Sequence, residues 1–196
     1  MKLLLLFFTL FFVSLSTMAQ TDQEADKPKV IFFDVNETLL DLTTMRDSVG
    51  EALDGRTELL PLWFSKMLHH SLVDSTTQRF HTFGEIGVAS LMMVAEVEGI
   101  PLTREQAKQA IVTPLRSLPP HPDVREGLKL LKDKGYTLVS LTNSSNKGVY
   151  TQFENAGLLS FFDERLSVED INLYKPDLRT MPGRQKKWGL SRRRRC

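Results

Sequence analysis

"VIFFDVNETLLDL", residues 30–42, is the stretch that decides the fold of this 196-residue chain. Its first four residues are apolar and favour a β-strand, and Asp34 follows them directly. A run this short and this apolar predicts a strand of a parallel sheet that is covered on both faces. The carboxylate at the end of a buried strand and the amide at Asn36 raise the question of what these two polar side chains do.

The rest of the chain alternates helical and strand-like patterns. Residues 43–115 carry apolar residues at three- and four-residue spacing, and Thr103 and Gln106 form a capping-box pattern there. An amphipathic helix ending at Gly135 precedes a second apolar strand, "TLVSLTNSS" (137–145), and a helix and a third strand follow. This order predicts an α/β fold with a doubly wound parallel sheet, and residues 43–115 form a helical cap inserted after the first strand.

Polar side chains follow each of the three predicted strands. Asp34 follows the first strand and Lys175 the third, and the second ends in Thr142, Asn143 and Ser144. Ligands of such sheets bind outside the carboxyl ends of the strands. A carboxylate nucleophile, an ammonium that keeps it ionised and groups that hold an anion would meet there. Each residue also has a plain structural alternative, as a strand end, turn, cap or solvated lysine, but their order at three strand ends favours a site.

The motifs "FFDVNETLLD", "SLTNSS" and "LYKPD" resemble the first three motifs of the haloacid dehalogenase superfamily. Over residues 30–177 the sequence is most similar to its type II (L-2-) haloacid dehalogenases. The resemblance implies that Asp34 attacks the halogen-bearing carbon of a small 2-haloacid and that water hydrolyses the resulting ester, with no metal or other cofactor. It also implies that Thr38 supports the Asp34 loop. Thr142 and Asn143 would contact the substrate carboxylate or the leaving group, and Lys175 would pair with Asp34.

Asn36 distinguishes the two main activities of this superfamily. The phosphatases carry an aspartate at this position, which serves the leaving alcohol as an acid, whereas an amide cannot shuttle a proton near neutral pH. A halide leaves without a proton, so Asn36 is compatible with carbon–halogen cleavage. We expect Asn36 to bind substrate together with Ser144 and the cap residues Trp63 and Phe64; the family's dehalogenases often have an arginine where Phe64 stands. A phosphoryl transferase with altered acid–base chemistry, or a non-catalytic binding or remnant protein, are the alternatives.

The N-terminal residues 1–19 have the pattern of an export signal. Lys2 precedes an apolar run at 3–13, and small residues precede a predicted cut after Ala19. The run is too short to span a bilayer, which takes about 20 residues; a buried helix is the alternative. We expect a periplasmic or secreted protein that is not membrane-bound after cleavage. Cys196 is the only cysteine, so no intramolecular disulfide can form.

Residues 178–196 differ in charge from the rest of the chain. They hold eight of the 25 Lys and Arg residues and no Asp or Glu, which leaves 17 basic against 24 acidic residues before them. The family resemblance ends at the same point, before a further strand and an acidic cluster. Our hypothesis is that the sequence from about Thr180 is a shifted frame or a truncation. The core would then be incomplete and the first strand would lie exposed along an edge. The alternative is a basic tail for nucleic acid or anionic lipid.

These patterns divide the chain into five parts. We predict a signal peptide at 1–19, a linker at 20–28, a core at 29–42 and 116–177, a cap at 43–115 and a basic tail at 178–196. The predicted partner is a small-molecule substrate and not a nucleic acid. A dimer is compatible with the sequence, which does not define the oligomeric state.

Overall fold

The computed structural model describes residues 29–181. Its sheet holds β1 (Val30–Phe33), β2 (Thr137–Thr142) and β3 (Glu164–Ser167), hydrogen-bonded in that order and all parallel. The α/β fold with a parallel sheet is thus confirmed. The predicted signal peptide (1–19), the linker up to residue 28 and the tail beyond residue 181 lie outside the described residues.

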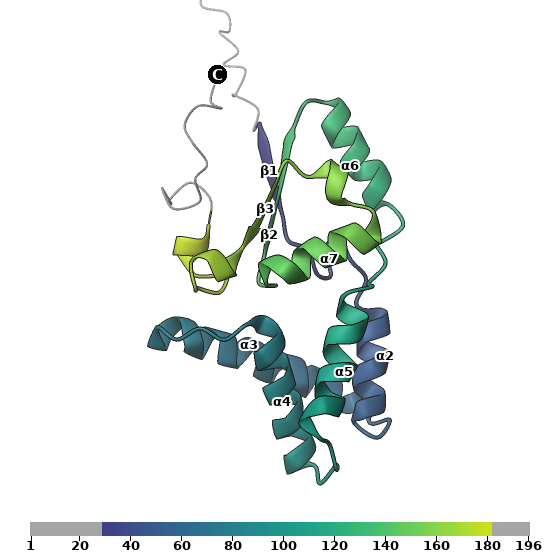
Figure 1. The fold of residues 1–196 in the computed structure, drawn as a ribbon, viewed down its shortest axis with the longest axis vertical. Coiled ribbons are helices and arrows are strands. Elements are labelled where there is room, and N and C mark those ends of the chain that lie inside the picture. The colour runs from purple at the N-terminus through teal and green to yellow at the C-terminus, as the bar shows by residue number, and fades with distance from the viewer. Residues whose placement is uncertain (1–28, 182–196) are drawn as a thin grey trace, which may run out of the picture.

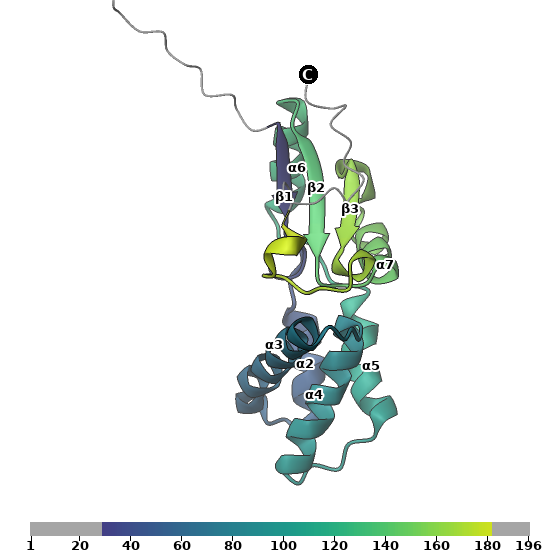
Figure 2. The ribbon, with the colours of Figure 1, turned by 90° about the vertical axis from the view of Figure 1, so that its left-hand side faces the viewer.

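Two helices, α6 (Val124–Asp133) and α7 (Asn146–Ala156), lie on the same face of the sheet, as the two views show (Figures 1 and 2). Short 3-10 turns follow later in the chain at η2 (Leu159–Phe161), η3 (Val168–Asp170) and η4 (Leu178–Thr180). β2 is the central strand, and five of its six residues are buried. Because α6 and α7 lie on a face of the sheet, they do not cover the carboxyl ends of the strands. The polar residues at these ends are therefore free to form a site.

β1 lies at one edge of the described sheet. Val30 is 38% exposed and the other three residues of the strand are half-buried. Within residues 29–181, α6 and α7 lie on one face of the sheet, so the prediction that this strand is covered on both faces is not met there (Figures 1 and 2). β1 also pairs there with β2 alone, which makes it an edge strand of the described sheet.

A separate helical layer lies beyond the carboxyl ends of the strands (Figure 1). It contains α2 (Thr43–Ala52), η1 (Thr57–Leu59), α3 (Leu60–Thr77), α4 (Phe83–Val97) and α5 (Arg104–Leu115). α4 packs between α3 and α5, and α5 also packs on α2. None of the helices in residues 29–181 has the length and apolar character to cross a membrane.

The starts and ends of several helices follow from their cap residues. The predicted capping box at α5 is confirmed: Gln106 N–H donates to Thr103 Oγ1 (3.3 Å), and Thr103 N–H donates to Gln106 Oε1 (2.9 Å). α4 begins with the same device, made by Thr82 and Glu85. Gly135 follows α6 at a φ of 81°, which only glycine adopts without strain, so the predicted end of this helix is also confirmed.

Candidate active site

A cavity of about 630 Å³ lies where the carboxyl ends of the strands face the helical layer. This volume is within the range typical of ligand pockets. The core side of its wall includes Asp34, Asn36, Thr142, Asn143, Ser144 and Lys175, and the cap side includes Trp63 and Phe64. The structure therefore brings together every predicted site residue except Thr38.

Asp34 and Lys175 form an ion pair in this cavity, with 2.5 Å between Lys175 Nζ and Asp34 Oδ1. The ammonium also donates to the main-chain carbonyl of Leu141 at 2.8 Å, and the main-chain N–H of Lys175 donates to Asn143 Oδ1 at 3.1 Å. The lysine side chain is 19% exposed and the aspartate side chain 49%. The lysine is thus fixed from two sides, while the carboxylate stays open to a ligand.

The loop after β1 is shaped by main-chain hydrogen bonds. Leu39 N–H donates to Val35 C=O at 2.8 Å, and Glu37, at a φ of 67°, donates its N–H to Leu40 C=O at 2.9 Å. This tight turn buries apolar side chains on both sides of the exposed Thr38. The Thr38 side chain makes no hydrogen bond to any residue in 29–181, and its predicted support of the Asp34 loop stays a prediction.

The turn after β2 is held by hydroxyl groups at the ends of β2 and β3. Ser144 N–H donates to Thr142 Oγ1 at 3.1 Å, and Ser167 Oγ donates to the carbonyl of Ser144 at 2.6 Å. All three side chains are buried. Asn143 Oδ1 accepts from the main-chain N–H of Lys175, which orients the amide, and the NH2 group of Asn143 makes no hydrogen bond to any residue in 29–181.

Gln152 is a site residue that the sequence analysis missed. Its Nε2 donates to Asn36 Oδ1 and to the main-chain carbonyl of Leu115, both at 3.0 Å, and Asn36 Nδ2 donates to Ser144 Oγ at 3.2 Å. Gln152 also lines the cavity. The available signal was a polar residue on the apolar face of α7, beside Phe153, where a helix normally presents a hydrophobic side chain.

The cap supplies an apolar wall of the cavity, and cap and core together supply basic residues. Trp63 is buried, and its indole N–H donates to Gly87 C=O at 3.0 Å; Phe64 lies beside it and is partly exposed. Four further basic residues line the cavity and were not predicted: Arg104, Lys108, Arg116 and Lys147. With Lys175, five basic side chains line the cavity, against the three carboxylates of Asp34, Glu37 and Glu85, and this excess of positive charge suits anionic ligands.

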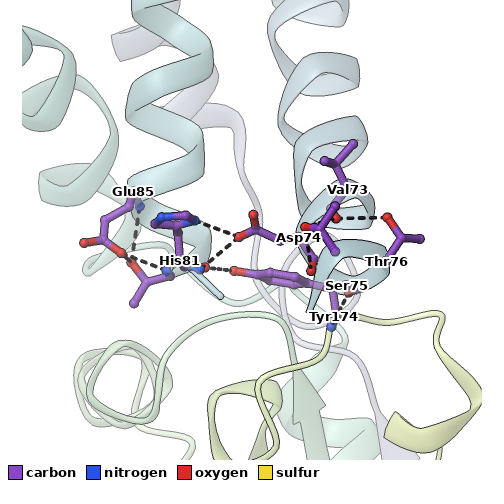
Figure 3. A network of polar contacts seen from close by, with 9 residues as sticks. Val73, Asp74, Ser75, Thr76, His81, Glu85 and Tyr174 are labelled. Carbon is purple, nitrogen blue, oxygen red and sulfur yellow. Dashed lines mark hydrogen bonds and ion pairs between the residues drawn. The ribbon is translucent and has the colours of Figure 1, made fainter. Parts of the chain in front are cut away.

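Tyr174, directly before Lys175, joins the core to the cap (Figure 3). Its hydroxyl donates to the carbonyl of His81, and its N–H donates to Ser75 Oγ at 3.0 Å. Asp74 Oδ2 accepts the N–H of His81 and lies 2.9 Å from the Nδ1 of its ring. Burial raises the pKa of the Tyr174 phenol above its usual value, so the phenol stays a protonated donor. The cap thereby holds the residue next to the lysine of the ion pair.

Comparisons with known proteins point in one direction. A sequence profile of haloacid dehalogenase-like hydrolases matches residues 28–181. The chain is 31% identical to an (S)-2-haloacid dehalogenase of Pseudomonas sp. (strain YL) over 168 residues, which cover 85% of this chain and 72% of that one. A haloacetate dehalogenase H-2 of Moraxella sp. (strain B) is 25% identical over 167 residues, covering 85% and 74%.

Solved structures agree with these sequence relatives. The L-2-haloacid dehalogenase of Xanthobacter autotrophicus superposes with a TM-score of 0.66 at 27% identity, covering 76% of this chain and 60% of that chain. The present chain thus spans about 60% of the length of that enzyme.

Proposed function

Because the chain belongs to the haloacid dehalogenase-like hydrolase family, we propose that it hydrolyses the carbon–halogen bond of a small 2-haloacid. The observation that carries the proposal is the Asp34–Lys175 ion pair at the cavity, with Asn36 beside it. Several related proteins are named (S)-2-haloacid dehalogenases, which supports the (S) configuration at the reacting carbon.

In the first step, the carboxylate of Asp34 attacks C2 of the haloacid. A carbon–oxygen bond forms, the carbon–halogen bond breaks, and the halogen leaves with the electron pair as halide. Asp34 suits this role because its Oδ2 makes no hydrogen bond to any residue in 29–181 and the side chain is half-exposed to the cavity. The ammonium of Lys175 pairs with Oδ1 and holds the carboxylate in place, and a carboxylate can act as a nucleophile.

In the second step, water attacks the carboxyl carbon of the ester. The bond between that carbon and the ester oxygen attached to C2 breaks, which releases a 2-hydroxy acid. Asp34 returns to the carboxylate, and one proton is lost to solvent. The ester splits one difficult displacement into two easier steps.

Asn36 favours this reaction over the hydrolysis of a phosphate ester. An alcohol leaving group needs a proton, and the amide of Asn36 has none to give near neutral pH. Its Nδ2 donates to Ser144 and its Oδ1 accepts from Gln152, so the amide is held by two residues that carry no acidic proton.

The direct test is halide release from 2-chloropropionate by the Asp34→Ala variant. We expect this substitution to abolish release, because the nucleophile is removed. Asp47→Ala, an exposed carboxylate on α2 that does not line the cavity, is the matched control and should keep full activity. Release that survives in Asp34→Ala would assign the nucleophile to another group.

We also propose that the protein is exported, which rests on the sequence of residues 1–19 alone. Expression of the full chain in a bacterial host, followed by mass spectrometry of the purified product, tests this. The expected mature chain begins at Gln20 and is found outside the cytoplasm. A cytoplasmic product that retains residues 1–19 would refute the export proposal without bearing on the chemistry of Asp34.

A further inference from the structure

The main-chain carbonyl of Leu115 determines the orientation of the Gln152 amide. A carbonyl oxygen can only accept a hydrogen bond, and that of Leu115 lies 3.0 Å from Gln152 Nε2. The end of the Gln152 amide nearest Leu115 must therefore be its NH2 group. The second hydrogen of this group points to Asn36 at the same distance, so the atom of Asn36 that faces it is its oxygen.

The orientation of Asn36 follows from that of Gln152. With Oδ1 of Asn36 occupied as an acceptor, the remaining polar atom is Nδ2, which carries two hydrogens. One of them goes to Ser144 Oγ at 3.2 Å. Since Asn36 lines the cavity, the second hydrogen is available to a bound ligand, and the ligand atom that meets it must be an acceptor. The Gln152 bond thus fixes the orientation of the Asn36 amide, with its NH2 group as the donor that is left for a ligand.

Packing alone does not account for a glutamine at this position. Gln152 is 1% exposed on the buried face of α7, and its Oε1 has no hydrogen-bond partner within the described part of the chain. A buried oxygen without a partner lowers stability, which a methionine of similar size would avoid. The feature that no apolar residue supplies is its NH2 group, which donates to Leu115 C=O and to Asn36 Oδ1.

We propose that Gln152 is a positioning residue, which orients the Asn36 amide so that it donates to the anionic part of the substrate. The proposal rests on the proposed function, since an organic anion is the ligand it requires. The basic residues of the cavity wall suit the same ligand class. Gln152 also joins α7 to Leu115, the last residue of the cap helix α5. The orientation of the Asn36 amide therefore depends on Leu115, where the chain returns from the cap to the core.

The first readout is the side-chain NH2 signal of Asn36 in a nitrogen–proton NMR spectrum of the full chain, assigned by its loss in Asn36→Asp. We expect Gln152→Met to shift this signal toward that of an exposed asparagine. Asn155→Leu is the matched control: Asn155 lies on the same helix and donates to Arg116 C=O at 2.8 Å, but does not contact Asn36. An unchanged Asn36 signal in Gln152→Met would overturn the proposal, as would an equal shift in Asn155→Leu.

The second readout is anion binding without turnover, followed on the same signal with propionate and with chloride. We expect at least one of these ions to move the Asn36 signal in the unmodified chain, and to bind about tenfold more weakly to Gln152→Met, since a hydrogen bond to a charged group is lost. A response to propionate assigns the donor to the carboxylate, and a response to chloride to the halide. No response to either ion, or equal affinities in both proteins, would overturn the proposal.

The third readout uses Gln152→Glu, which keeps the shape of the side chain. Its ionised carboxylate cannot donate to Leu115 or Asn36, whereas the protonated acid can donate one bond, and burial raises the pKa of such a carboxyl. The rate of halide release relative to the unmodified chain should therefore rise as the pH falls, while the same ratio for Gln152→Met stays flat. A flat ratio in both variants contradicts the proposal. If the unmodified chain releases no halide, the proposed function fails, and the two NMR readouts still decide the role of Gln152.

Discussion

Lys175 is, after Asp34, the side chain on which the proposed chemistry depends most. Its ammonium is held between the carboxylate of Asp34 and the carbonyl of Leu141, and its main chain is held by Asn143. A partly exposed ion pair contributes at most about 1 kcal/mol to stability. We therefore propose that this pair serves catalysis, where a fixed positive charge stabilises the anions that form.

Tyr174→Phe tests whether the cap helps to hold Lys175. The variant keeps the ring, which stacks on Phe80, and removes the hydroxyl that donates to His81 C=O. We expect a loss of about 1 kcal/mol in the free energy of unfolding, typical of one buried hydrogen bond, together with a lower kcat for halide release. Urea denaturation and a halide assay measure the two effects.

The matched control for this variant is Tyr150→Phe, since Tyr150 is exposed on α7 and its hydroxyl makes no hydrogen bond within residues 29–181. It should leave both quantities unchanged. A Tyr174→Phe protein with unaltered stability and kcat would show that the hydroxyl contact has no part in holding the lysine.

Single residues differed in how well the sequence predicted them. Asp34, Asn143 and Lys175 could be predicted because each follows a strand, and parallel strands bring their carboxyl ends to one edge. Gln152 and Tyr174 could not, because their partners lie far along the chain: Leu115 is 37 residues from Gln152. A hydrogen bond of that span depends on tertiary packing, which local pattern does not contain.

Helices and strands were predicted best where a local signal marks their ends. The capping box at Thr103 and the glycine after α6 are interactions within a few residues, so the sequence alone suffices. The coverage of β1 was predicted less well, because the apolar character of a strand does not report which faces of the sheet the helices cover. α6 and α7 lie on the same face of the described sheet (Figures 1 and 2).

The two capping boxes of the cap give a prediction on acid stability. Hydrogen bonds from the side chain and then the main chain of Thr82 lower the pKa of Glu85 below its usual value. A carboxyl with a lowered folded-state pKa adds stability above its unfolded pKa, about 4.3, and loses it as the pH falls through the folded value. The box at α5 has Gln106 in the same place, which does not titrate.

We therefore expect Glu85→Gln to reduce the loss of stability on acidification, and Gln106→Glu to increase it. Urea unfolding of the two variants and the unmodified chain, at neutral pH and below the unfolded pKa of glutamate, measures the difference. If Glu85→Gln leaves the pH dependence unchanged, the first turn of α4 does not contribute to it. Gln106→Glu is the control, because it makes the opposite substitution at the same position of the other capping box and should change the pH dependence in the opposite direction.

At the scale of the whole molecule, the site forms between the sheet and the helical layer. Asp34, the β2 turn and Lys175 lie along one edge of the sheet and line the cavity. The helical layer lies opposite this edge (Figure 1). The order of elements in the sequence was enough to predict the α/β fold and an inserted helical block. The contact between the core and the helical cap was not predictable, because Tyr174 and Gln152 make it through hydrogen bonds to cap residues far along the chain.

The position of β1 predicts an uneven pattern of hydrogen exchange. β2 is paired on both sides and almost wholly buried, so its amides should exchange slowest. Amides of β1 that face away from β2 should exchange much faster, since an edge group is open to water. Exchange followed by NMR or mass spectrometry measures this. Equal protection of β1 and β2 would mean that a further segment pairs with β1.

The most direct test of the central claim is turnover of 2-chloropropionate in water labelled with heavy oxygen, followed by mass spectrometry of the peptide that contains Asp34. If Asp34 forms an ester and water attacks its carboxyl carbon, the label enters the carboxylate of Asp34 and the peptide becomes heavier with successive turnovers. If halide is released while the label appears only in the hydroxy acid, water attacks the substrate directly. Asp34 would then not be the nucleophile.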